Sequence, residues 1–521
     1  MWAAGNLPET TKIVDICHDD CVQILAAAAA VLTLISGPTP PAEFGSDWDD
    51  PRTAAPPVTA PHAPSCSTTI VDTEFRDFTP YRSNYEPVCK GPWQKVVLRL
   101  EGSVAGRQYD RLGYLTVGGV TVFKTSTPEP SVDGITWSVE KDLTEYSALL
   151  AKPQPIEMLI GNVVDDTYTG ILDVTVKLTF YRGKAPVAPD VLPLGQAIPR
   201  NTEKLFADVY ATGSGGGCEE FWYLTVPDDV AYSCLADDGP YREVQITIDG
   251  RVAGIAAPYP HIYTGGWSNP FMWYVLPAPR AFDIQPIRYD LTPFAGLLTD
   301  GKVHDITVDV VGVPEGQSGW DVPTALLAWR DAGSKQVTGK LLGTTATPLR
   351  NNSTYAAPTL TTTGGHSLAV TGYVDTSHGR VTTTVGRTVA NTSTHTWNAD
   401  ETQDALDAVW TDTSRTTVTA GRSRPSTTTI SRRYALDGAV TIDSDNRLTT
   451  TISLTDAVTK PGRKILDTYE GEASWLLGVP RDQRHATGVS TERYRVWQPG
   501  PDYDHTIRVV NGTVVIDRFN G

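Results

Sequence analysis

The sequence has little of what long helices and phosphate-binding surfaces require. It holds 3 Met among 521 residues, 20% charged residues and no extended Glu/Lys/Leu stretch, a composition that disfavours helices. It has no run of Lys or Arg, and its net charge is −17, so nucleic acid and anionic membrane surfaces are excluded as partners. The apolar run 24–35 is too short to cross a bilayer. The acidity suits a secreted protein that acts on neutral substrates such as sugars.

What the sequence does have are residues of strands and turns. Gly (45), Pro (38) and Trp (13) are plentiful, and Thr is abundant after residue 344. The length suits roughly three domains. We expect four of the six cysteines to form two pairs that are local in sequence, Cys66–Cys89 and Cys218–Cys234, which is one of three possible connectivities. Such pairing indicates an oxidising compartment, and the spacings do not suit a zinc site.

The chain begins with two segments that are not expected to belong to a folded core. Residues 1–45, which include Cys17 and Cys21, resemble a signal peptide with an apolar centre, although the basic start of such peptides is missing. A buried apolar helix is the alternative. Residues 46–65 are Pro-rich and polar, which predicts an extended linker or a wrapping arm.

Two β units with matching sequence features follow. The motif Asp142-Leu143-Thr144 with a later Leu-Leu pair recurs at Asp290-Leu291-Thr292, and each copy follows a strand–turn–strand pattern. We therefore expect an all-β protein with two tandem jelly rolls, each an eight-stranded antiparallel sandwich, and a ligand cleft between them. The predicted parts are a first domain at 66–185, a Pro-rich linker at 186–200, a second domain at 201–344 and a Thr-rich C-terminal β domain at 345–521.

Candidate catalytic groups lie on the connections of both units. Asp110 stands beside Arg111 between two strand-like runs, which suits either a general base or an ordinary ion pair. In the second unit the glycine-rich stretch 213–217 leads into Glu219, Glu220 and Trp222. Acids beside aromatics are typical of a sugar site, although Trp222 also suits a core position. A loop at 259–270 contributes Trp267.

These residues stand in motifs that resemble a known family. From Cys66 to about Gly312 the chain resembles the A-type peptide-N-glycosidases, with GPWQKVVL at Gly91, GRQYDR at Gly106, TSTPEP at Thr125 and NVVDDTYTG at Asn162. Enzymes of this family detach N-linked glycans from asparagine. A more distant similarity to the F-type branch, which is built from two eight-stranded jelly rolls, agrees with the duplication.

The resemblance implies roles for individual residues. The context Tyr109-Asp110-Arg111 matches that of the essential aspartate of the F-type branch, and Glu220 matches its second acid. Asn162 stands where that branch has a third acid, whose role is either taken by the Asn162 amide, moved to Asp165 or Asp166, or absent. Trp267 matches its Gly-Trp loop. We expect Asp110 and Glu220 to be catalytic, and the substrate to be bound by Arg111, Asn162, Glu219, Trp222, Trp267 and Asp165.

The resemblance also implies what the protein acts on. We expect a secreted monomer that hydrolyses the amide between an asparagine side chain and the innermost N-acetylglucosamine of an N-glycopeptide or glycoprotein. No metal or cofactor is expected, and neither nucleic acid nor membrane is expected as a partner. Three alternatives remain: an endoglycosidase with Asp110 and Glu220 as its carboxylate pair, a glycan-binding protein without activity, and a structural jelly-roll protein.

Overall fold

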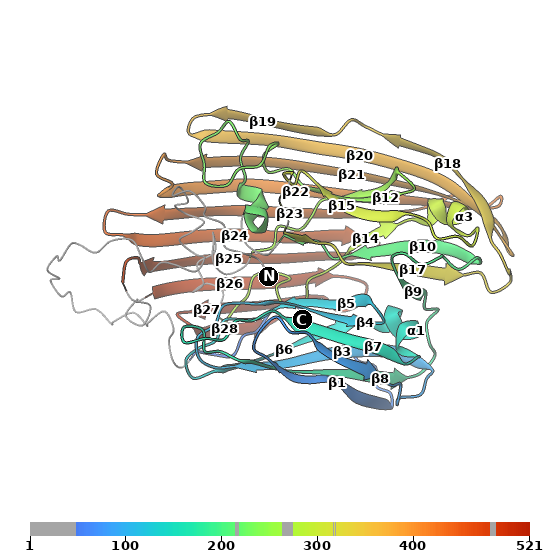
Figure 1. Cartoon of the computed structure of the whole chain (residues 1–521), viewed down its shortest axis with the longest axis horizontal. Coiled ribbons are helices and arrows are strands. Elements are labelled where there is room, and N and C mark those ends of the chain that lie inside the picture. The colour runs from blue at the N-terminus through green and yellow to red at the C-terminus, as the bar shows by residue number, and fades with distance from the viewer. Residues whose placement is uncertain are drawn as a thin grey trace.

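The computed structural model describes residues 48–213, 218–262, 275–315, 317, 319–479 and 486–520, and it is built almost entirely from antiparallel strands (Figure 1). The predicted signal segment 1–45, with Cys17 and Cys21, lies outside the described residues. Trp267 and most of the glycine-rich stretch 213–217 also lie outside them. None of the helices in the described part of the chain is long and apolar enough to cross a membrane.

The first unit is a sandwich of two four-stranded sheets that enclose a core of their own. One sheet has the order β1 (Ser65–Phe75), β8 (Leu172–Arg182), β3 (Trp93–Val104) and β6 (Ile135–Asp142). The other has the order β2 (Tyr81–Tyr85), β7 (Gln154–Ile160), β4 (Leu112–Val117) and β5 (Val120–Ser126). The chain changes sheet repeatedly, as in Greek-key sandwiches. The sandwich at 66–185 is therefore as expected, while its jelly-roll classification stays a prediction.

Glycine decides where the β4–β5 hairpin turns. Gly118 and Gly119 have φ angles of 61° and 78°, which a two-residue turn of this kind requires and which side chains with a Cβ rarely adopt. In the second unit, Asp249 (φ 47°) and Gly250 (φ 74°) turn the hairpin of β12 (Glu243–Ile248) and β13 (Arg251–Ala256) in the same way. The strand–turn–strand patterns expected from sequence are both present.

The repeated Asp-Leu-Thr motif forms the same local structure in both units. In the first, the 3-10 turn η2 (Thr144–Tyr146) runs into α1 (Ser147–Leu150), and in the second η4 (Thr292–Phe294) runs into α3 (Ala295–Leu298). In each copy the Thr backbone N–H donates to the Asp Oδ1 at 3.0 Å. In each copy the Thr Oγ1 also accepts from the backbone N–H of a strand residue. This equivalence supports a duplicated β unit.

The second unit is less regular than predicted. Its described strands form a four-stranded sheet, β14 (Ile287–Asp290), β10 (Thr202–Val209), β17 (Thr324–Arg330) and β9 (Asp190–Pro193), with a three-stranded sheet of β13, β12 and β15 (Ile306–Val311) and the pair β11 (Thr212–Gly213) and β16 (Trp320–Asp321). β9 lies inside the predicted linker 186–200. It is an edge strand that pairs with β17, and an edge position tolerates the missing N–H of Pro193.

The C-terminal part is one large antiparallel sheet of eleven strands in the described residues. It begins at β18, before the predicted boundary at 345, and its strands are β18 (Thr338–Ala346), β19 (Arg350–Ala356), β20 (Thr359–Thr376), β21 (Gly379–Trp397), β22 (Gln403–Ala420), β23 (Ser426–Ile442), β24 (Arg447–Lys460), β25 (Arg463–Leu476), β26 (Ala486–Trp497), β27 (Tyr503–Val510) and β28 (Thr513–Phe519). Hydroxyl pairs across neighbouring strands explain the Thr runs, as between Thr371 and Thr384 at 3.0 Å.

This large sheet shares its core with the second unit. One continuous cluster of buried residues includes Trp222 and Val244 of the second unit together with Trp410 and Leu436 of the sheet. Polar groups buried between them are paired: the Tyr232 hydroxyl donates to Asp404 at 2.6 Å, and Arg280 makes a two-point contact with Asp456. The C-terminal sheet therefore completes the core of the second unit and is not a separate module.

The Pro-rich segment 46–65 begins as an arm on the far strands of the large sheet. Asp49 accepts from the backbone N–H of Val514 at 2.6 Å, and Arg52 pairs with Asp517. The buried Ala54 donates its N–H to the Glu492 carboxylate at 2.7 Å. Asp50 meanwhile accepts from the backbone and hydroxyl of Thr136 on β6. Of the two predicted alternatives, the structure shows the wrapping arm, which joins the first sandwich to the large sheet.

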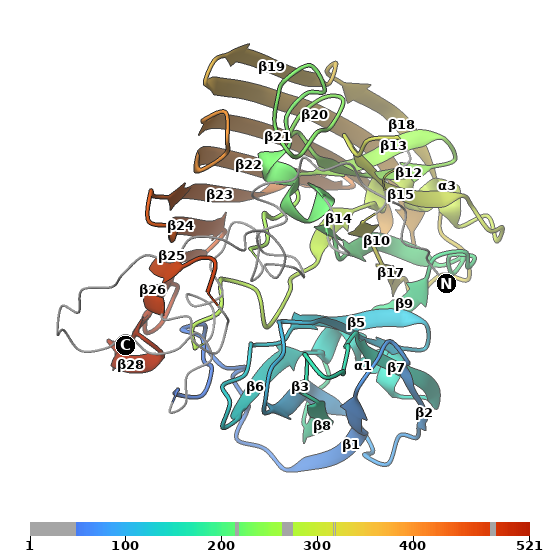
Figure 2. The same ribbon diagram turned by 60° about the vertical axis from the view of Figure 1, so that its left-hand side comes forward.

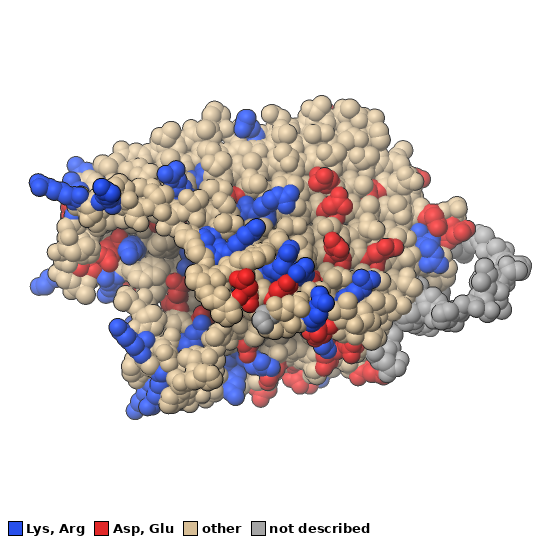
Figure 3. All heavy atoms as spheres, turned by 180° about the vertical axis from the view of Figure 1, so that it is seen from behind, with Lys and Arg blue, Asp and Glu red and all other residues tan. Residues whose placement is uncertain are grey.

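Both predicted disulfides are present. Cys66–Cys89 joins the start of β1 to the loop before β3, and Cys218–Cys234 closes a loop in the second unit. On the face that Figure 3 shows, basic and acidic side chains lie over an otherwise uncharged surface.

The arm is anchored by the buried acid Glu492, and this contact makes the stability of the protein depend on pH. Glu492 accepts from Ala54 and Thr53, and burial raises its pKa to about 7. Asp467 on the neighbouring strand is also buried, and burial together with the charge of Glu492 raises its pKa. Asp456 and Arg280 are the other charged groups that act on Asp467, and the Arg280 charge opposes the shift.

We predict that the protein is more stable at pH 5 than at pH 8. The folded state binds the Glu492 proton more tightly than the unfolded state, whose pKa is near 4.5, so the free energy of unfolding falls as pH rises towards 7. The loss is about 3 kcal/mol if this group acts alone. Glu492→Gln should flatten the pH dependence of the thermal midpoint, whereas Glu470→Gln, at an exposed position of β25, should not. Parallel curves for wild type and Glu492→Gln would contradict this assignment.

Candidate active site

The loop between β3 and β4 carries Asp110 at one edge of the first sandwich. Arg111 clamps this loop onto the end of β5, because its backbone N–H donates to Thr127 Oγ1 at 2.8 Å while the Thr127 N–H donates to the Arg111 carbonyl at 2.9 Å. Asp110 is half-buried, and the Ser126 hydroxyl lies 3.5 Å from its Oδ2. The aspartate therefore sits at a sheet edge, as predicted, beside the last residue of β5.

A buried amide, not noticed as important from sequence, holds the same loop. Gln108 is 1% exposed, and its Oε1 accepts from the Tyr109 backbone N–H and from the Arg111 guanidinium. The same guanidinium lies 6.0 Å from the centre of the Tyr168 ring. The described contacts of the Arg111 side chain are thus with Gln108 and Tyr168, and its expected role in holding Asp110 stays a prediction.

The loop between β7 and β8 packs beside this one and carries two further predicted residues. Asn162 is buried, and its amide donates to the Phe75 and Gly170 carbonyls while its Oδ1 accepts from Val163. Asp165 is exposed and closes its own turn by accepting from the N–H groups of Thr167 and Tyr168, which lower its pKa. Both residues shape the loop, and their contacts show no shared carboxylate site with Asp110.

The two neighbouring glutamates of the second unit lie in different environments. Both belong to the short helical segment η3 (Cys218–Leu224). Glu219 is 1% exposed and receives two bonds from the fully buried Arg242 and one from the Trp320 indole N–H. Glu220 is half-buried. Burial raises the pKa of Tyr223, and the charge of Glu220 raises it further, which places the Glu220 carboxylate near that phenol.

Trp222 is placed in the core rather than in a cleft. It is 2% exposed, and its ring packs against Tyr223, Trp320 and Trp410 at centroid distances of 5.7, 6.1 and 5.4 Å. This matches the alternative reading of Trp222 as a core aromatic. Trp267, the other predicted aromatic ligand, lies outside the described residues.

Strand β5 runs from the neighbourhood of Asp110 in the first unit to the contact with the second unit, which carries Glu219 and Glu220. Figure 2 shows β5 on the side of the first sandwich that faces β9, β10 and β17. Its fully buried Lys124 donates to Thr212 at 2.7 Å and to Asp321 at 2.6 Å, on β11 and β16 of the second unit. Gly213 of β11 is packed so closely on η3 that an added Cβ would lie 2.1 Å from the Glu219 carbonyl oxygen. Ser126, next to Asp110, is two residues along the same strand.

Two further titratable groups near this junction are buried. Burial, followed by the charges of Arg280 and Lys124, lowers the pKa of His261 to about 3, so its imidazole is neutral at mildly acidic pH. Glu129 of the Thr-Pro-Glu-Pro motif is fully buried. Asp110 and Glu220, by contrast, are half-buried.

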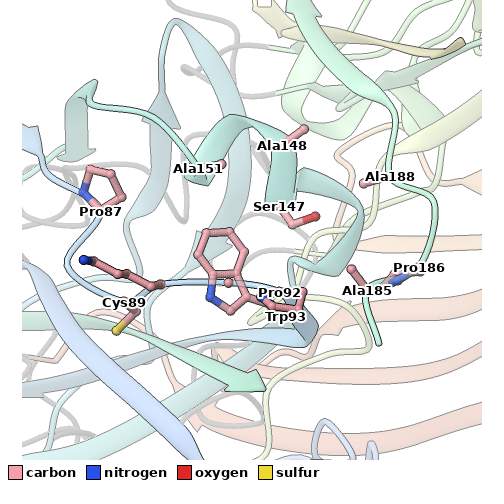
Figure 4. Close-up of a pocket in the computed structure, with 12 residues that line it drawn as sticks. Pro87, Cys89, Pro92, Trp93, Ser147, Ala148, Ala151, Ala185, Pro186 and Ala188 are labelled. Carbon is pink, nitrogen blue, oxygen red and sulfur yellow. The ribbon is translucent and has the colours of Figure 1, made fainter. Parts of the chain in front are cut away.

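One cavity of the described residues lies away from Asp110. Figure 4 shows a pocket of about 440 Å³ lined by Pro87, Cys89, Trp93, Ala148 and Pro186, among others. It opens at the start of β3, whereas Asp110 follows the end of that strand, which spans about 36 Å for its twelve residues. Glu203, Asp331 and His378 are close enough to hold a metal ion, but the Asp331 carboxylate already accepts from Ser377 and Gly333.

The family model described as peptide N-acetyl-beta-D-glucosaminyl asparaginase amidase A matches residues 54–347, which is more than half of the chain. The chain belongs to this family. The matched segment contains both units and therefore every predicted site residue from Asp110 to Trp267. The family model ends near the start of the large sheet, although that sheet is part of the same core.

One curated relative agrees with this membership. The chain is 30% identical over 381 residues to the peptide-N4-(N-acetyl-beta-glucosaminyl)asparagine amidase A of Prunus dulcis, a match that covers 63% of this chain and 66%, just under two thirds, of that protein. Among solved structures, PNGase F, a glycosylasparaginase from Flavobacterium meningosepticum, is similar at 12% identity and a TM-score of 0.34, over 51% of this chain and 96% of that one.

We predict that Glu219 and Glu220 differ sharply in their contribution to stability. Glu219→Gln leaves the buried Arg242 guanidinium without a counter-charge, which should lower the free energy of unfolding by about 3–5 kcal/mol. Glu220→Gln, at the adjacent and half-buried position, should change it by less than about 1 kcal/mol. Urea unfolding of both variants measures the difference. Equal losses would show that the ion pair does not stabilise the fold.

Proposed function

We propose that the protein hydrolyses the amide bond between an asparagine side chain and the innermost N-acetylglucosamine of N-glycopeptides and glycoproteins. The observation that carries this proposal is that the segment matched by the family contains both half-buried acids, Asp110 and Glu220. The name of the Prunus dulcis relative describes an amidase for this bond. The products are aspartate in the peptide and a glycosylamine, which then loses ammonia.

In the proposed reaction, Asp110 is the general base. Its carboxylate accepts a proton from a water molecule while the water oxygen bonds to the side-chain carbonyl carbon. The neighbouring Ser126 hydroxyl and the loop clamp at Thr127 favour a fixed carboxylate. Arg111 follows Asp110 directly in the chain, and its guanidinium is proposed to stabilise the oxyanion that develops on the carbonyl oxygen.

Glu220 is proposed to protonate the leaving nitrogen and to bind the first sugar. The C–N bond breaks as this proton is delivered, and the glycosylamine leaves. We keep Arg111 and Trp267 as proposed substrate ligands. Asn162, Glu219 and Trp222 are buried by protein contacts and Asp165 closes its own turn, so we propose that these four shape the walls of the site.

The remaining properties follow from the chemistry. Hydrolysis by a carboxylate base and a carboxylic acid needs no metal or organic cofactor, and we propose none. The two disulfides favour folding in an oxidising compartment, so we propose a secreted enzyme that acts as a monomer on glycoprotein substrates.

The first test is the mass of the product formed in heavy-oxygen water. After incubation of an N-glycopeptide at mildly acidic pH, we expect a sugar-free peptide in which Asn has become Asp with one heavy oxygen, because water attacks the amide carbonyl. A boiled sample controls for spontaneous deamidation. If the peptide keeps one N-acetylglucosamine, the protein is an endoglycosidase. If the glycopeptide binds but is unchanged, the protein is a glycan-binding protein.

A second test separates the roles of the two acids from the stability of the fold. Asp110→Asn should lower kcat by about 10³-fold, because the amide cannot accept the proton of water. Glu220→Gln should lower it by about 10²-fold or more. Asp72→Asn, at an exposed position of β1, is the matched control and should keep full activity. A folded Asp110→Asn variant with more than a few per cent of the wild-type kcat would exclude Asp110 as the base.

A further inference from the structure

We propose that Gln108 is a positioning residue of this reaction, which fixes the loop of Asp110 and the guanidinium of Arg111 without touching the substrate. That Gln108 assists catalysis rests on the proposed function. That it fixes the two loops rests on its hydrogen bonds. Asp110 and Arg111 stand on a connection between strands, which backbone bonds hold at separate points, from the Thr127 N–H to the Arg111 carbonyl and from the Gly170 N–H to the Arg107 carbonyl. A loop that carries a catalytic base needs another constraint.

The Gln108 amide supplies that constraint with both of its ends. Its Nε2 donates to the Val163 carbonyl at 2.9 Å and to the Gly170 carbonyl at 3.1 Å. Its Oε1 accepts from the Tyr109 backbone N–H at 3.1 Å and from the Arg111 Nε at 3.0 Å. With 1% exposure, water cannot replace these partners, so each lost bond leaves a buried polar group unsatisfied.

The carbonyls that Gln108 holds belong to the loop between β7 and β8. Gly170 donates its N–H to the Arg107 carbonyl, and a Cβ at Gly170 would lie 2.9 Å from the Gln108 Cβ, so the two loops touch. Asn162 donates to the same Gly170 carbonyl as Gln108 does. The Gln108 amide thus connects two loops. Asp110 lies between Tyr109 and Arg111, and both of these residues donate to the Gln108 side chain.

The chemistry of the position selects glutamine. The side chain must donate twice to carbonyls and accept from an N–H and a guanidinium, and only a carboxamide of this length does both. A glutamate at 108 would keep its hold on Arg111 but would turn a negative oxygen towards two carbonyl oxygens. A methionine of similar volume would lose every bond.

The test compares Gln108→Met and Gln108→Glu with Gln154→Met, a matched control at a partly buried glutamine of β7 that bonds to the Leu149 carbonyl. Steady-state kinetics on an N-glycopeptide are measured with folded samples, checked by circular dichroism. Gln108→Met should lower kcat by about 10- to 100-fold, as a misplaced base does, and change KM by less than about threefold. Gln108→Glu should shift the acidic limb of the kcat/KM profile to higher pH, since a new carboxylate beside Asp110 makes it harder to ionise. The control should match wild type in both respects.

Hydrogen exchange gives a readout that does not depend on activity. Gln108→Met should increase amide exchange in segments 108–111 and 163–170, and Gln154→Met should not. The proposal is overturned if Gln108→Met keeps the wild-type kcat and pH profile, if its kcat falls only with the folded fraction, or if exchange in both loops is unchanged. An inactive wild type would instead refute the proposed function, and the exchange result would still decide whether Gln108 fixes the loops.

Discussion

The relative position of the two candidate acids depends on one buried cation. Lys124 is fully buried on β5, and an ammonium in that environment is tolerated only with an opposite charge and hydrogen-bond acceptors. Both come from the second unit, as Asp321 and Thr212. Because β5 also ends beside Asp110, and β11 lies against η3, this contact fixes the first sandwich against the segment that carries Glu220. Burial lowers the pKa of the lysine, and the charge of Asp321 opposes that effect.

The large C-terminal sheet supports the same segment from the other side. Trp222 of η3 packs on Trp410 of β22, and Tyr232, close to the disulfide at Cys234, donates to Asp404. Paired polar groups at such an interface favour one arrangement of the two layers over others, because a shifted arrangement would leave buried charges unpaired. The sheet therefore acts on the site through the position of η3, although no catalytic role is proposed for any of its residues.

Sequence reasoning succeeded where the signal was local. The Gly118-Gly119 turn, the repeated Asp-Leu-Thr turns and the two local disulfides follow from residue types within a few positions of one another, and all are confirmed. It failed where the outcome depended on partners far along the chain. The strand β9 was expected as linker because of its prolines, but β17, more than a hundred residues later, offers it an edge. The large sheet shares its core with the second unit, and nothing in a Thr-rich strand shows which core it completes.

The adjacent glutamates show why residue type cannot assign a role. By residue type alone, Glu219 and Glu220 are equivalent acids beside an aromatic pair, and only the family resemblance distinguishes them. In the fold, Glu220 is half-buried, whereas Glu219 is held by a buried guanidinium and an indole N–H. Its partners, Arg242 and Trp320, are distant in sequence, and the second is brought into place only by β16, the strand that also holds Lys124 through Asp321. The buried Glu219 thus holds η3 in place through its bonds to Arg242 and Trp320. The same segment carries the half-buried Glu220, the candidate catalytic acid.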